Sequence, residues 1–115
     1  MVGSFARALA VFVDRCALVT AVQEMVGKWR LHLLDAYPLD LYYGQATGRY
    51  SYALVREEQR VIAWDNAPHH RDLPNFPHHA HRPGGEISPS ALNGDPEHDL
   101  ELVRLEVEAY LGRSV

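Results

Sequence analysis

Histidine is concentrated in one short part of this chain, because five of its seven histidines lie within thirteen consecutive positions. They belong to residues 64–82, WDNAPHHRDLPNFPHHAHR, which also contain prolines at positions 68, 74 and 77. Since proline fixes φ and has no backbone donor, we expect a stiff loop here and neither a helix nor a central strand. Imidazole titrates near neutral pH and fills a core poorly, so this loop indicates chemistry or metal binding.

Acid–base catalysis is the first interpretation of this loop. One imidazole would act as general base, a second as general acid, and an arginine would stabilise phosphate charge. Such a site suits RNA cleavage, in which the 2′-hydroxyl is an internal nucleophile and no metal is needed. Asp65 would orient one imidazole through its Nδ1 atom. The predicted catalytic residues are Asp65, His69, His70, Arg71, His78, His79 and His81. The predicted substrate-binding residues are Asn66, Arg82, Tyr52 and Trp64.

The spacing of the histidines restricts which of them can meet. Adjacent side chains of an extended segment point in opposite directions, so at most one of His69 and His70 should face a common site. If the second histidine block is extended, His79 and His81 share a face and His78 points away from it. The loop must fold back for both blocks to meet.

Two other interpretations of the loop remain open. In the first, His79 and His81 bind Zn²⁺ or another borderline divalent ion together with Asp65 or Asp72. No established zinc spacing is present, so no cofactor is firmly predicted. In the second, Asp65 and Asn66 accept hydrogen bonds from turn amides and the histidines satisfy loop carbonyls.

Length and charge place the chain among ordinary globular proteins. Its 115 residues predict one domain spanning 1–115, and 47% hydrophobic residues argue against disorder. The net charge of −4 is carried by the last twenty-one residues, which disfavours nonspecific duplex binding. The single Cys16 cannot form an internal disulfide, and the apolar N-terminus is interrupted by charges. We therefore expect a cytoplasmic protein that does not cross a membrane.

Hydrophobic periodicity predicts an α+β fold. An amphipathic helix capped by Ser4 should present Phe5, Leu9 and Phe12 on one face. A second helix should begin at Asp95 and Pro96 and bury an apolar face. Alternating segments joined by short turns predict an antiparallel β-meander packed against both helices, with the long His/Pro-rich loop after it. The predicted strands are residues 18–25, 29–33, 39–43, 50–55 and 61–64.

Aromatic residues recur on these strands and permit two interpretations. They could form a platform on which RNA bases stack, or they could pack in the core and across strands, which is the commoner role. The residues are Trp29, Tyr42, Tyr43, Tyr50, Tyr52 and Trp64.

Several blocks of the chain resemble the TumE family of prokaryotic toxins. They are Tyr50-Ser51-Tyr52, DNAPHH at 65–70, FPHHAH at 76–81 and Ser88-Pro89-Ser90. The resemblance extends from the strands around Leu31 to the C-terminal helix. It implies an α+β toxin encoded beside a cognate antitoxin, often one with a helix-turn-helix domain.

The acidic C-terminal helix suggests where such a partner would bind. A DNA-binding antitoxin carries basic surface, so we expect Glu101, Glu106 or Glu108 to contribute to docking. The alternative is a solvated helix face. We also expect an exposed edge of the meander to offer a homodimer contact.

Overall fold

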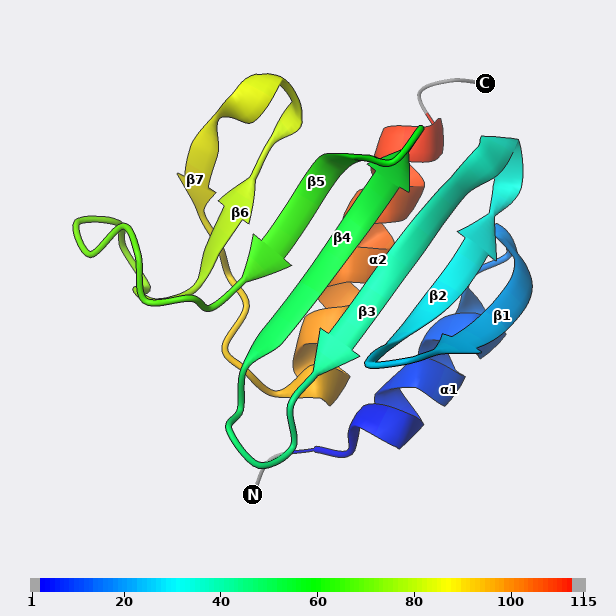
Figure 1. Cartoon of the computed structure of the whole chain (residues 1–115), viewed down its shortest axis with the longest axis horizontal. Coiled ribbons are helices and arrows are strands. Elements are labelled where there is room, and N and C mark those ends of the chain that lie inside the picture. Colours follow the sequence, from blue (N-terminus) through cyan, green and yellow to red (C-terminus); the bar gives the residue numbers. More distant parts are fainter. Residues whose placement is uncertain (1–2, 113–115) are drawn as a thin grey trace.

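A computed structural model, in which residues 3–112 are described, shows one seven-stranded antiparallel sheet with two helices on one face (Figure 1). The strands follow one another in sequence order, so each pairs with its chain neighbour and β1 and β7 form the edges. This is the α+β meander predicted from the sequence. The elements are α1 (Phe5–Arg15), β1 (Val19–Met25), β2 (Lys28–Leu33), β3 (Tyr37–Tyr43), β4 (Tyr50–Arg56), β5 (Gln59–Asp65), β6 (His79–His81), β7 (Ile87–Pro89) and α2 (Pro96–Gly112).

The hydrophobic core lies between the sheet and the two helices. Strand residues alternate, so that the apolar side chains of β2 to β5 face the helices. Phe12 of α1 and Leu100 of α2 meet them in the core. The largest buried strand residues are Leu31, Leu39, Leu41, Tyr52, Leu54 and Trp64. None of the elements formed by residues 3–112 covers the opposite face (Figure 1).

Both predicted helix caps are confirmed. The Ser4 hydroxyl accepts a hydrogen bond from the Arg7 amide at 3.2 Å, and the Asp95 carboxylate accepts one from the Glu97 amide at 3.1 Å. The Glu97 carboxylate also accepts the Ser4 amide at 2.8 Å, which ties the start of α1 to the start of α2. The two helices therefore lie together on the sheet.

The burial of Tyr52 and Trp64 contradicts the prediction that they bind substrate. Their exposed fractions are 0% and 1%, because both face the helices. The Trp64 indole donates to Glu106 of α2 at 2.7 Å, whereas the Tyr52 hydroxyl has no hydrogen-bond partner among the described residues. Both rings are core residues and present no face on which a base could stack.

The expected long loop is shorter than the His/Pro-rich segment. We predicted no central strand within residues 64–82, but His79–His81 form β6 between β5 and β7. The prediction was wrong because the prolines flank this stretch and do not interrupt it, so its amides are free to pair. The loop that remains joins Asp65 to His79 and projects from the side of the sheet (Figure 1).

The acidic residues of α2 have partners within the chain. Arg104 pairs with Glu101 and Glu108 along the helix. Arg82 pairs with Glu106 at 2.9 Å. Surface pairs of this kind contribute little stability, but they neutralise much of the acidic field expected to attract an antitoxin.

Asp99 yields a stability prediction because its carboxylate is fully buried at the start of α2. It accepts the amides of Asn93 and Gly94 at 2.9 and 2.7 Å. Asp99→Ala would leave two amides without acceptors, so we expect the free energy of unfolding to fall by about 2–4 kcal/mol. Urea denaturation measures this loss. The control Glu108→Ala breaks a partly exposed pair with Arg104 and should change stability by less than about 1 kcal/mol. Equal effects of both variants would contradict this role of Asp99.

Candidate active site

The pairing of β5 with β6 brings a carboxylate and two imidazoles together on the uncovered face of the sheet. Asp65 is the direct cross-strand partner of His79, and His81 lies two residues further along β6 on the same face. One Asp65 oxygen lies 3.2 Å from His79 Nε2, and the other lies 3.2 Å from His81 Nε2. The first oxygen also accepts the Ala67 amide at 2.9 Å, which fixes the carboxylate.

His70 completes this group from the loop. Its ring centroid lies 5.0 Å from that of His79 and 6.5 Å from that of His81. The backbone of His70 has φ of 60°, which lets the chain turn back towards the sheet. We call Asp65, His70, His79 and His81 the histidine cluster. His69 lies on the outer side of His70, with 6.4 Å between the ring centroids.

The hydrogen bonds of His79 fix its tautomer. Its Nδ1 atom donates to the Pro77 carbonyl oxygen at 3.0 Å, because a carbonyl can only accept. With Nδ1 as the donor, the neutral ring presents the lone pair of Nε2 to the Asp65 carboxylate. This contact is attractive only when a proton or a metal ion lies between Nε2 and the carboxylate oxygen. The ring is 2% exposed, so the surrounding residues fix its orientation. His79 is thus held with its Nε2 atom against the Asp65 carboxylate.

His81 is the more accessible imidazole, with 27% of its side chain exposed. Burial lowers its pKa below the ordinary value of histidine, and the positive charge of Arg60 acts in the same direction, whereas Asp65 opposes the shift. The neutral ring donates its Nε2 proton to Asp65, which leaves Nδ1 as an acceptor. The prediction that Asp65 orients an imidazole through Nδ1 was therefore wrong, because both imidazoles of β6 meet it through Nε2. This is the arrangement of a general base that a carboxylate orients.

His78 lies apart from the cluster, as the alternation of an extended segment predicted. Its Nδ1 atom and the Tyr50 hydroxyl are 2.9 Å apart, and the two rings stack. Burial lowers the pKa of His78. Its predicted catalytic role is therefore not supported by its position, because the sheet separates it from Asp65.

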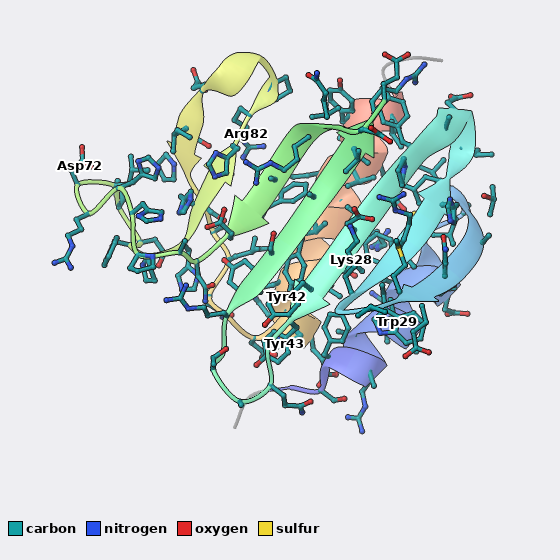
Figure 2. The ribbon with its side chains drawn as sticks, in the orientation of Figure 1. Lys28, Trp29, Tyr42, Tyr43, Asp72 and Arg82 are labelled. Atoms are coloured by element: carbon teal, nitrogen blue, oxygen red, sulfur yellow. The ribbon has the colours of Figure 1, made fainter. Side chains whose placement is uncertain are left out.

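The predicted polar residues around the loop also have other positions. Arg71 lies over the Phe76 ring, and Asp72 lies at the outer end of the loop in Figure 2, away from the cluster. Arg82 follows β6 on the helix side, where it contacts Ser88 and Glu106. The structure therefore does not place Arg71 or Arg82 where either would neutralise a phosphate at the cluster, nor Asp72 where it would join Asp65 as a metal ligand.

Asn66 has a structural role in place of the predicted substrate contact. Its side-chain oxygen accepts the Tyr50 amide at 3.0 Å, and its amide donates to the Gly48 carbonyl at 2.9 Å. These bonds join the end of β5 to the turn before β4. They hold Asp65 in place from the neighbouring position.

Arg60 is a cation that the sequence analysis missed. It lies on β5, on the same side of the sheet as Val55, and its charge lowers the pKa of His81. The sequence signal that could have found Arg60 was its place near the start of a predicted strand. Which face of the sheet Arg60 lies on depends on a bulge at Leu54 and Val55, which alternation alone does not predict. Of the arginines considered, Arg60 is the one whose charge reaches the cluster.

The family of the chain follows from comparison with known proteins. The family model described as Toxin TumE matches residues 5–111. The chain belongs to the TumE toxin family. No curated protein and no solved structure gave a match.

Membership in the TumE family gives the chain its broad role. It is the toxin of a toxin–antitoxin system, and a cognate antitoxin is its implied partner. The match includes α1, which the resemblance found in the sequence did not reach. No helix among the described residues of this TumE toxin is both long and apolar enough to cross a membrane.

The electrostatics of the histidine cluster in this TumE toxin give a prediction for the pKa of His81. Because the Asp65 charge raises the pKa of His81 against the effect of burial, Asp65→Asn should lower that pKa further. Titration of the imidazole nitrogen shifts by NMR measures the change. His78 is an internal reference, because the charge that opposes its burial comes from Asp99, so its pKa should change less than that of His81. A higher pKa of His81 in Asp65→Asn would contradict this account.

Proposed function

We propose that this toxin inhibits growth by cleaving RNA at the histidine cluster. The observation that carries the proposal is the contact of one carboxylate with two imidazoles of unequal exposure. His81 would remove the proton from the 2′-hydroxyl through its free Nδ1, and His79 or His70 would donate a proton to the leaving oxygen. Arg60 would stabilise the charge that develops on the phosphate.

The residues of the cluster divide this work according to their surroundings. Asp65 touches both imidazoles and would act mainly by orienting them and by stabilising the protonated forms. His79 is fixed by the Pro77 carbonyl, whereas His70 lies on the loop and has room to meet a substrate. An internal 2′-hydroxyl nucleophile leaves a 2′,3′-cyclic phosphate and a 5′-hydroxyl, so the products report the mechanism.

Toxicity and RNA cleavage test this proposal together. Expression without the antitoxin should arrest growth, and His81→Ala or His70→Ala should relieve the arrest with a loss of cleavage of about 10²- to 10⁴-fold. Sequencing of 5′-hydroxyl RNA ends during expression measures the cleavage. The matched controls His32→Ala and His98→Ala remove histidines outside the cluster and should remain toxic.

Two outcomes would contradict the proposal. One is growth arrest with RNA that stays intact. The other is full toxicity of a variant that lacks His70, His79 and His81, provided that circular dichroism shows it folded.

A second candidate function is binding of a divalent metal without catalysis. One ligand atom from each of Asp65, His79 and His81 lies within 4.8 Å of the others, which favours an ion such as Zn²⁺. The bond from His79 Nδ1 to a backbone carbonyl is typical of a metal-binding histidine. On this proposal the toxin would be a metal-holding binding module that acts through a protein contact.

Metal analysis of the purified, untagged protein distinguishes the two functions. A metal module should carry about one ion per chain, and His81→Ala or Asp65→Asn should lose it while His78→Ala retains it. If the protein still cleaves RNA after a chelator has removed any metal, the imidazoles carry out the cleavage without a metal ion. Protein that takes up no Zn²⁺ during calorimetric titration would exclude the metal module.

The antitoxin contact and the oligomeric state remain proposals. A helix-turn-helix antitoxin would bring basic surface, and Glu101 and Glu108, each paired with Arg104, are the half-exposed carboxylates of α2 that we propose to meet it. The sheet edge at β1 is largely exposed along its seven residues, whereas β7 has three residues and includes Pro89. β1 is therefore the edge that we propose for pairing with a second copy.

A further inference from the structure

A trough crosses the uncovered face of the sheet beside the histidine cluster. Its floor is formed on β4 by Ser51, Ala53 and Val55, whose small side chains leave a depression of about 460 Å³ between longer neighbours. Lys28 and Tyr42 line one side (Figure 2). Arg60, on β5, lines the other. Such a depression gives an extended chain a place to lie.

The trough is continuous with the cluster through the strand register. Tyr42 pairs with Ser51, Ser51 pairs with Asp65, and Asp65 pairs with His79. These four residues form one row across β3 to β6, on the uncovered face. Since neighbouring strands lie about 4.8 Å apart, the row is about 14 Å long, which a few nucleotides of single strand can span. Arg60 borders the trough, and its charge also reaches His81.

Positive charge exceeds negative charge along the trough. Lys28 and Arg30 share the single carboxylate of Asp40, at 2.8 and 2.7 Å. Arg60 on the opposite side has no ion pair within the described part of the chain, although Glu58 also borders the depression. Three cations against two carboxylates favour a polyanion here, in a chain whose net charge is −4.

Tyr42 gives the trough an aromatic surface. Its exposed fraction is 42%, in contrast to the buried Tyr50 and Tyr52. An exposed ring beside cations is the combination that single-stranded nucleic acid binds, because unpaired bases stack on the ring while phosphates meet the charges. Paired bases have no free face for such stacking.

We propose that single-stranded RNA lies across this trough, with a base on Tyr42 and phosphates at Lys28 and Arg60, and enters the histidine cluster from Ser51. This inference rests on the proposed RNA cleavage and adds the surface that selects the substrate. The trough positions the strand, and the cluster acts on the phosphodiester that lies beyond Asp65.

Binding of a fluorescent single-stranded 2′-O-methyl RNA tests the trough, because this probe lacks the nucleophile and stays intact. Lys28→Ala and Arg60→Ala should each reduce the slope of log affinity against log salt by about 0.7. Tyr42→Ala should weaken binding by at least about fivefold, and Tyr42→Phe should restore it. The control Arg7→Ala, an exposed cation on α1, should bind as the unmodified protein does.

The proposal that RNA binds in the trough is wrong if the double variant Lys28→Ala, Arg60→Ala keeps the affinity and salt dependence of the unmodified protein. Equal affinity for a duplex of the same sequence would overturn it as well. The proposed cleavage can fail separately. If the chain binds RNA through Tyr42 and Arg60 but never cuts it, the binding surface is confirmed and the proposed cleavage is wrong.

Discussion

The register between β5 and β6 is the constraint on which the candidate site depends. It places Asp65 opposite His79, and the two-residue period of a strand then places His81 on the same face. A shift by one residue would send both histidines into the core and bring Ala80 to the surface. Trp64 and Ala80 hold the register, because each is buried against the helices one position away from the polar residues. The core thereby fixes the geometry of the site on the opposite face.

The two faces of the sheet have different chemistry because only one of them is covered. The helix side is apolar apart from a few polar groups, among them the bonded Asp99 carboxylate and the Tyr52 hydroxyl, which has no partner among the described residues. The uncovered side combines small residues with ion pairs and imidazoles, so charged groups there keep partial contact with water. On this face His79 is more buried than His81, and the loop residue His70 lies nearer to it, at 5.0 Å against 6.5 Å between ring centroids. Groups with such different surroundings are suited to different steps of a proton transfer.

Ion pairs within the chain distinguish the arginines that stabilise the fold from those that are available to a ligand. Arg82 binds Glu106 and so joins the end of β6 to α2, whereas Arg104 binds Glu101 and Glu108 within α2. Arg60 lies outside these pairs; it borders the trough, and its positive charge lowers the pKa of His81. The same distinction applies to the aromatic residues, because Tyr52 and Trp64 pack in the core while Tyr42 is exposed. Residue type alone therefore did not identify which cation or ring could meet a substrate.

The sequence by itself determined the local features of this protein. Alternation predicted five strands, capping residues predicted both helices, and the loop motifs indicated the TumE family. It also predicted that His79 and His81 share a face from which His78 is turned away. The tertiary structure alone decided that β6 is a strand, that Arg82 faces α2 and that Arg60 reaches His81. The reason is physical: periodicity records which side chains share a face of one element, whereas burial and charge pairing depend on what packs against that face.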